Sequence, residues 1–319
     1  MPVFSIIVTA YNQEKCIIKA IESILSQSFL DYEILLIDDF STDNTYSVLS
    51  DYEKKYENIH VYRHKENKGS HQARKTGVEN ANGNYILFLD GDDFLYTDTL
   101  KKLYYEVIQK ETFDVCECSY MKLPEGKKQL PFDFDVSQER LLYYSQPGCA
   151  TLVWNKLYLS TIIKTAFSEM ENAYIRCGDD TYESICIAYY TKKFIQRDII
   201  IINYNIGDGV SFKKNTFESN QKHADSLQAT LKLLKQFLYQ KNIKDWEQFY
   251  AKVENNLFNW FFSVCKNNTD EKDIEKSLLL LPKVFSINLI EPYFAKLYKF
   301  YRLKRKIKNF IKKIVHKYN

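Results

Sequence analysis

Residues 84–95 read NYILFLDGDDFL, a stretch that changes character half-way along. The apolar run over residues 86–89 predicts a strand that is covered on both faces. Three carboxylates follow within four residues, at Asp90, Asp92 and Asp93. Like charges repel one another at such short range, so a group of them after a buried strand needs an explanation.

This acidic turn has two interpretations. In the first, it is a solvated turn in which Asp92 or Asp93 caps the helix that follows. In the second, it is a metal and nucleotide site, because two acids that flank one residue can reach a common point. Mg²⁺ and Mn²⁺ take few carboxylates and complete their shell with water and substrate phosphates. A diphosphate leaving group suits this site, since the metal neutralises charge as the bond breaks.

The composition indicates a folded protein. The chain has 319 residues, of which 45% are hydrophobic and 27% are charged, and this balance argues against disorder. We find no basic segment or cleavage site of a signal peptide, and no apolar run long enough to span a membrane. The seven cysteines show no CxxC pair and no zinc spacing. We therefore expect reduced thiols, no disulfides and a cytoplasmic protein.

The first 115 residues alternate strand and helix patterns. Apolar runs in VFSIIVTAY, YEILLIDD, NIHVYRH and GNYILFLD predict four strands, with helical spacing between them. This order indicates an α/β fold with a largely parallel sheet flanked by helices. Ligands bind beyond the carboxyl ends of the strands in such sheets. Polar residues follow three of these strands, at Tyr11, at Asp39 and over 90–93, so we expect a site there.

The rest of the chain is mixed and then helical. FDVCECSY and FIQRDIIIINYNI predict strands, and the segment that begins CGDD at Cys177 predicts a helix. Every pattern from about Phe217 onward is helical. Residues 296–317 hold ten lysines and arginines and no acid, so the remaining chain carries −7 against a formal total of +3.

Apolar residues recur among the basic ones of this tail, residues 296–317. The pattern predicts a basic amphipathic helix that lies on an anionic membrane. A helix packed on the body of the protein and an oligomer contact are the alternatives, which leaves a homo-oligomer open. We find no nucleic-acid-binding motif, so nucleic acid is not an expected partner.

Several segments stand in the order and spacing of the family 2 glycosyltransferases, and the chain resembles that family over about residues 3–212. They are FSIIVTAYN, LLIDDFSTDNT and ENKGSHQARKTGVENANGNYILFLDGDDFL, with weaker matches at WNKLY and GDD. The resemblance implies the GT-A fold over residues 1–212. Residues 1–115 would bind a nucleotide sugar and 116–212 would shape the acceptor site, followed by a helical region over 213–319.

The resemblance also implies roles at the nucleotide end. Ala10, Tyr11 and Asp39 correspond to the positions that hold the base, with Asp39 accepting a hydrogen bond from the ring N–H. Arg74 is a candidate contact for the donor, and a surface charge on a helix is its alternative.

The acidic turn takes the remaining donor roles. Asp90 corresponds to the residue nearest the ribose, and Asp92 to the ligand of a Mn²⁺ or Mg²⁺ ion that meets the diphosphate. Asp93 is a second metal ligand or a helix cap in this scheme.

The catalytic base implied by the family is the second acid of a pair that begins a helix, which here is Asp180 after Asp179. Inversion at a sugar carbon requires an acceptor hydroxyl to attack opposite the leaving nucleotide, and a base must take its proton. The alternative is a pair of helix-capping carboxylates favoured by the helix dipole. The dipole would also lower the basicity of Asp180.

Three further side chains are not expected to take part in binding or catalysis. Trp154 lies in the stretch that resembles the acceptor side, yet a core position is commoner for tryptophan than stacking on a sugar. His64 and His71 lie near the nucleotide side and have no partner at metal-binding spacing. We expect both histidines on the surface.

The sequence therefore predicts an inverting, metal-dependent hexosyl- or N-acetylhexosaminyltransferase. It would move a sugar from a nucleotide diphosphate, expected to be UDP, to a hydroxyl of a glycan or lipid-linked acceptor. A role in bacterial surface polysaccharide synthesis, such as capsule or lipopolysaccharide, and a place on the inner face of the cell membrane complete the hypothesis.

Two alternatives stay open. A catalytically weak nucleotide-sugar-binding or scaffolding protein would keep the same fold. A nucleotidyltransferase would usually carry a glycine-rich basic loop after the first strand, where this chain has TAYNQEK.

Overall fold

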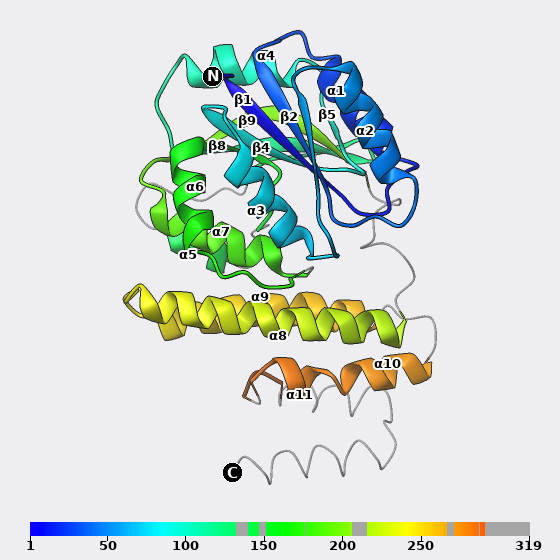
Figure 1. Cartoon of the computed structure of the whole chain (residues 1–319). Helices are drawn as coiled ribbons and strands as arrows, with labels where there is room; N and C mark the ends of the chain where they lie inside the picture. The colour runs from blue at the N-terminus through cyan, green and yellow to red at the C-terminus, as the bar shows by residue number, and fades with distance from the viewer. Residues whose placement is uncertain are drawn as a thin grey trace.

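The structure, a computed structural model, describes residues 1–131, 140–146, 151–175, 177–205, 216–266, 271–286 and 288–290 (Figure 1). The strands are β1 (Phe4–Ala10), β2 (Tyr32–Asp38), β3 (Ile59–Arg63), β4 (Tyr85–Asp90), β5 (Phe94–Leu95), β6 (Val115–Leu123), β7 (Lys127–Gln129), β8 (Lys156–Leu159) and β9 (Phe194–Asn205). The helices are α1 (Ile17–Leu25), α2 (Thr45–Lys55), α3 (Ser70–Asn80), α4 (Thr99–Lys102) with the π-helical segment η1 (Leu103–Ile108), α5 (Arg140–Ser145), α6 (Ser160–Glu169), α7 (Asp179–Tyr190), α8 (Phe217–Gln240), α9 (Trp246–Lys266), α10 (Glu271–Leu278) and α11 (Leu281–Val284).

The strands form one mixed sheet in the order β3-β2-β1-β4-β8-β6-β9-β5, with β7 paired to β6. The four strands β3, β2, β1 and β4 are parallel, as predicted, because helices α1, α2 and α3 return the chain to the same end each time. Strand β8 then runs antiparallel to both β4 and β6, while β6 and β9 are parallel. The α/β fold predicted from the sequence is confirmed, with the parallel order confined mainly to its first half.

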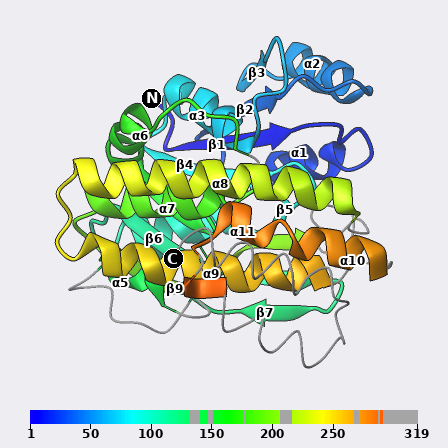
Figure 2. The same ribbon diagram turned by 90° about the horizontal axis from the view of Figure 1, so that it is seen from below.

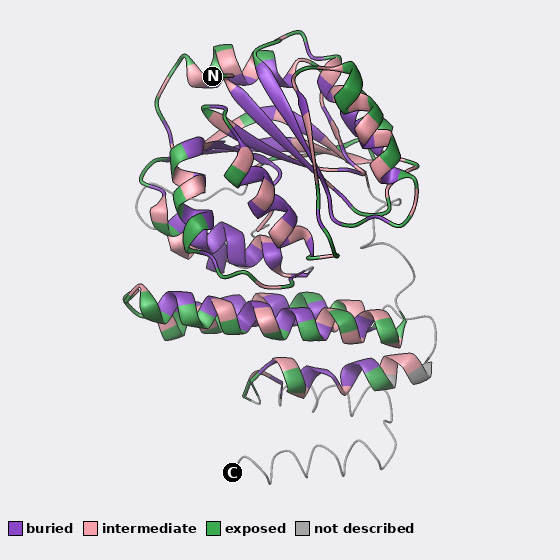
Figure 3. Cartoon of the chain, viewed as in Figure 1, coloured by how far each residue is buried: buried purple, intermediate pink, exposed green. Residues whose placement is uncertain are grey.

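The core lies on both faces of this sheet, and the central strands are buried along nearly their whole length (Figure 3). Helix α1 covers it with Ile17, Ala20, Ile21 and Ile24, which recur at helical spacing. Each such large side chain stabilises the fold by roughly 1.5–3 kcal/mol when it leaves water. The apolar runs of β1, β2 and β4 are therefore buried strands, as their composition predicts, while β3 at the edge of the sheet is only partly buried.

One prediction about a buried side chain is confirmed. Trp154 is buried and packs on Tyr120 and Tyr204, so it belongs to the core. Cys116 and Cys118 lie on one face of β6 with their sulfurs 3.8 Å apart, and the six cysteines within the described ranges are all free thiols.

The long helices α8 and α9 run side by side and pack against the α/β part through α7 and α5 (Figures 1 and 2). Their contact faces are apolar, with Leu227, Leu234, Phe258 and Phe261 fully buried. None of the helices in the described segments is both long and apolar enough to cross a membrane. The predicted boundary at residues 212 and 213 and the basic tail lie outside the described residues.

Candidate functional site

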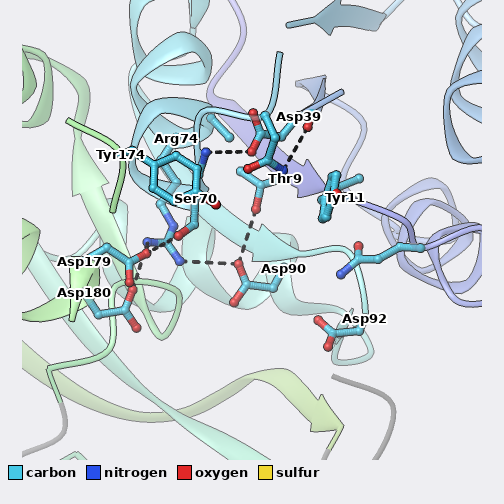
Figure 4. A pocket seen from close by; sticks show the side chains of 15 residues that line it. Thr9, Tyr11, Asp39, Ser70, Arg74, Asp90, Asp92, Tyr174, Asp179 and Asp180 are labelled. Atoms are coloured by element: carbon cyan, nitrogen blue, oxygen red, sulfur yellow. Dashed lines mark hydrogen bonds and ion pairs between the residues drawn. The ribbon is translucent and has the colours of Figure 1, made fainter. Parts of the chain in front are cut away.

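The carboxyl ends of β1, β2 and β4 open onto a cleft of about 270 Å³ (Figure 4). The parallel register sets Ala10 beside Asp38 and Thr9 beside Asp90, which brings the three polar strand ends to one place. The lining residues are Thr9, Ala10, Tyr11, Gln13, Asp39, Asn67, Gly69, Ser70, Ala73, Arg74, Asp90, Asp92, Tyr174, Asp179 and Asp180. All the site residues predicted from the sequence line this cleft except Asp93.

Asp93 is buried beside the cleft instead of facing it. Its Oδ1 accepts a hydrogen bond from the backbone N–H of Asn205 at 2.8 Å, which ties the acidic turn to the end of β9. Burial, aided by the neighbouring charge of Asp90, raises the pKa of the Asp93 carboxyl to about 9. A strand, β5, follows it, so Asp93 caps no helix. In the structure Asp93 therefore braces the acidic turn, and its assignment as a second metal ligand stays a prediction.

Asp39 organises the end of the cleft where the sequence predicts that the nucleotide base binds. Its carboxylate accepts hydrogen bonds from the backbone N–H groups of Lys68 and Gly69, each at 2.8 Å, and contacts His64 Nδ1 at 2.7 Å. A carboxylate offers about four acceptor positions, so one is left for a ligand. The turn that Asp39 holds leads directly into α3. Tyr11 is half-exposed beside it, which suits the predicted contact with a base.

The expectation of surface histidines is wrong for both residues. His64 is buried between Asp39 and the hydroxyl of Thr76, which lies 2.9 Å from its Nε2. His71 is fully buried, and its Nδ1 lies 2.8 Å from Glu183 Oε1. Each histidine is buried because a partner distant in the sequence satisfies its ring, and local sequence spacing cannot reveal such partners.

Arg74 crosses the cleft from α3, and its interpretation as a surface charge is wrong. It is 3% exposed, and its Nη1 lies 2.9 Å from Asp179, 2.9 Å from Asp180 and 3.0 Å from Glu183. Its Nη2 lies 3.5 Å from Asp90. Figure 4 shows the guanidinium between the acids that begin α7 and the end of β4. One buried cation therefore links the acidic turn to the acid pair on α7.

Asp180 lies at the first turn of α7, with a quarter of its side chain exposed at the cleft. Burial raises the pKa of the Asp180 carboxyl well above its ordinary value; Arg74 opposes this shift, while Asp179 and Glu183 add to it. The lowered basicity expected from the helix dipole is therefore wrong in direction, because burial and like charges outweigh the dipole. A carboxylate with a raised pKa is a stronger base near neutral pH.

Comparison with known proteins bears on what this cleft is for. Residues 5–151, which include nearly all of β1, the acidic turn and Arg74, match the family model described as Glycosyl transferase family 2. This segment of the chain therefore matches a family 2 glycosyltransferase domain. The resemblance read from its motifs is thereby confirmed.

Relatives and structural neighbours agree with this assignment. The chain is 30% identical over 205 residues to a poly(ribitol-phosphate) beta-glucosyltransferase of Bacillus spizizenii. The aligned region covers 59% of this chain and 32% of the relative. It spans half or less of the length of such curated relatives. S. aureus TarS 1–349 in complex with UDP-GlcNAc superposes with a TM-score of 0.57 at 19% identity, over 86% of this chain and 89% of that one.

A second solved structure covers more of the chain. The mannosyltransferase PcManGT from Pyrobaculum calidifontis, in complex with GDP-Man and Mn²⁺, gives a TM-score of 0.53 at 15% identity. It covers 98% of this chain and 83% of its own. At these identities the two solved structures establish the GT-A fold of the family 2 domain.

The acidic turn of the family 2 domain presents carboxylate oxygens, the ligands that a hard divalent cation prefers. Asp92 lines the cleft, and the side chain of Asp90 is 30% exposed there. Across the described ranges, no three His, Cys, Asp or Glu side chains gather closely enough to hold a metal by themselves. Mg²⁺ and Mn²⁺ do not need such a cage, because one or two carboxylates suffice when substrate phosphates complete the shell. The donor set fits.

Several residues at this site were not singled out from the sequence, among them Tyr174, Ser70 and Glu183. Tyr174 stands at the lip of the cleft with half its surface exposed, and Ser70 donates a hydrogen bond to Asp179. Glu183 is fully buried behind Arg74. Only Glu183 had a sequence signal, since it follows Asp179 by four residues and so shares its helix face. Ser70 and Tyr174 reach the cleft through contacts between distant segments.

Proposed function

We propose that the protein is an inverting glycosyltransferase that moves a sugar from a nucleotide diphosphate, with UDP expected, to a hydroxyl of a glycan or lipid-linked acceptor. One observation carries the proposal: the residues assigned to the nucleotide base, to the diphosphate and to the acceptor hydroxyl all line one cleft. Surface polysaccharide synthesis is the proposed setting. The names of relatives support it, among them a putative teichuronic acid biosynthesis glycosyltransferase of Bacillus subtilis.

The geometry supports a division of labour along the cleft. Tyr11 and Asp39 would hold the base at one end, and Asp180 would accept the proton of the acceptor hydroxyl at the other. That oxygen then bonds to the sugar carbon from the face opposite the nucleotide, while the bond from that carbon to the diphosphate oxygen breaks. A base with a raised pKa suits this step, because it must take a proton from a hydroxyl group.

The diphosphate would lie at the acidic turn. Asp92, with Asp90 beside it, would hold a Mn²⁺ or Mg²⁺ ion, which when bound supplies positive charge to the leaving diphosphate. Asp90 also lies 3.4 Å from the hydroxyl of Thr9, which fixes its orientation at the cleft. Arg74 contacts Asp90 from the other side and adds a permanent positive charge near the same point.

Donor hydrolysis tests the metal role. Hydrolysis of a panel of UDP-sugars should require Mn²⁺ or Mg²⁺, and both EDTA and Asp92→Asn should lower the rate by roughly 10–100-fold, because each removes the charge that stabilises the leaving group. Product UDP can be measured by a coupled assay. Hydrolysis that is unaffected by both EDTA and Asp92→Asn would reject the metal role.

Asp180→Asn separates the enzyme from a scaffold of the same fold. An enzyme loses transfer to an acceptor but still binds UDP, because Asp180 lies away from the nucleotide end. A scaffold shows UDP binding and no transfer in either form. Calorimetry with UDP and a transfer assay on the same preparations distinguish these outcomes.

A further inference from the structure

Arg74 is shared among more carboxylates than one guanidinium can neutralise. Its Nη1 lies within 3.0 Å of Asp179, Asp180 and Glu183, and Asp90 lies 3.5 Å from Nη2. These four acids compete for one positive charge, so any change in one of them alters how strongly Arg74 pairs with the others. Asp180 is the member of this group that the proposed reaction uses as a base.

Glu183 is the one member of the group that has no access to the cleft. It is 0% exposed and lies one turn after Asp179 on the buried side of α7. Its Oε2 accepts a hydrogen bond from Arg74 at 3.0 Å, so it holds the guanidinium from behind. Burial of a carboxylate at this depth costs free energy unless charged and hydrogen-bonding groups pair with it.

His71 contacts the other carboxylate oxygen of Glu183. Its Nδ1 lies 2.8 Å from Glu183 Oε1, and its Nε2 lies 3.2 Å from the backbone carbonyl of Glu171. The ring is fully buried between Phe167 and Tyr182. Both Glu183 oxygens are therefore occupied, one by α3 through Arg74 and one by α3 through His71, which fixes the carboxylate in place.

We propose that Glu183 is a positioning residue for sugar transfer: anchored by His71, it keeps Arg74 from pairing with Asp180 alone and so leaves Asp180 able to accept a proton. The inference rests on the proposed role of Asp180 as the base. The charged or titratable groups that act on Asp180 come from four elements: Arg74 on α3, Asp90 on β4, Tyr158 on β8, and Asp179 with Glu183 on α7.

The direction of the effect follows from the charges. Without the negative charge of Glu183, the positive charge of Arg74 acts more strongly on Asp180 and one repelling carboxylate is gone. Both changes lower the pKa of Asp180. In Glu183→Gln, the acidic limb of the pH profile of kcat should therefore move to lower pH by about 0.5–1 unit. A weaker base should also lower the plateau of kcat, by roughly two- to threefold.

The experiment compares the pH dependence of transfer in four proteins. Glu183→Asp keeps the charge and should keep the wild-type limb. Glu254→Gln is the matched control: it removes another buried glutamate, one that accepts hydrogen bonds from Ser286 on the far side of α9, and it should leave the limb unmoved. A purely structural role for Glu183 would lower activity at every pH without moving the limb, and that result would overturn the inference.

Two further variants keep the outcome decisive. If Glu183→Gln does not fold, Asp179→Asn removes a different partner from the same Arg74 nitrogen and must move the limb in the same direction; an unmoved limb overturns the inference. If Asp180→Asn still transfers sugar at the wild-type rate, the assignment of the base fails instead. If Asp180→Asn loses transfer while the acidic limb of the pH profile is unmoved in Glu183→Gln, the inference about Glu183 is wrong and the assignment of Asp180 as the base still stands.

Discussion

Gly69 lies where the residues before α3 pack against the loop before α7. Its backbone, with φ +83° and ψ 163°, is in a region that only glycine adopts readily, and a Cβ there would lie 2.6 Å from the carbonyl oxygen of Ile175. Gly69→Ala should therefore cost about 2–3 kcal/mol of unfolding free energy. Urea denaturation followed by circular dichroism measures this loss.

Gly126 provides the matched control for Gly69. It also has a positive φ, +63°, but a Cβ would meet nothing within 4 Å. Gly126→Ala should cost only the backbone strain, about 1 kcal/mol. If the two substitutions cost the same, the contact with Ile175 does not matter and the close packing at Gly69 is not what shapes this side of the cleft.

The residues that the sequence could place are those whose motif is local. Asp90 and Asp92 follow a recognisable strand, and Asp180 begins a recognisable helix, so each was expected where it lies. The burial of His71 and the ion pairs of Arg74 were not expected, because α3 buries polar side chains that hydropathy assigns to the surface. Their burial depends on acids more than 100 residues further along the chain, and only the folded structure brings these together.

At the scale of elements, α8 holds the turn from which α7 begins. The Ser226 hydroxyl accepts from the backbone N–H of Cys177 and donates to its carbonyl, both at 3.1 Å, and Thr230 donates to the same carbonyl. Asp179 and Asp180 follow this turn directly. Ser226→Ala should cost about 1–3 kcal/mol, since it leaves the buried N–H of Cys177 without this acceptor. It should also lower transfer, because the start of α7 loosens.

Thr230→Val is the comparison for Ser226→Ala. It removes only one of two donors to the Cys177 carbonyl, so its cost should be below that of Ser226→Ala. Thermal unfolding and kcat of both variants check the order. A Ser226→Ala protein with wild-type stability and transfer would show that α8 does not support the acid pair.

The sequence also predicted most elements correctly while leaving part of their pairing undetermined. The apolar runs of β1, β2, β3 and β4 alternate with helices, which determines a parallel arrangement. Strand β8 has four residues and lies antiparallel between β4 and β6. Nothing local specifies that insertion, because the partners of so short a strand are chosen by distant contacts.

At the scale of the whole molecule, charge is divided between an acidic body and the basic tail over residues 296–317. The ten basic residues of the tail leave −7 for the rest of a chain whose formal charge is +3. An anionic bilayer would attract the tail and repel the body. This arrangement would turn the body away from the lipid surface while keeping the enzyme close to a lipid-linked acceptor.

Deletion of the chain from Lys296 onward tests this membrane proposal. The full chain should sediment with vesicles of 30% phosphatidylserine at moderate salt and not with neutral vesicles, because each basic residue near an anionic surface contributes about 1 kcal/mol. The shortened chain should stay in the supernatant. Raising the salt to about 0.5 M should release the full chain as well, since screening shortens the reach of the charges. If the shortened chain still binds vesicles, the membrane contact lies elsewhere in the protein. If the full chain does not bind vesicles and the shortened chain unfolds at a lower temperature, the tail packs on the body.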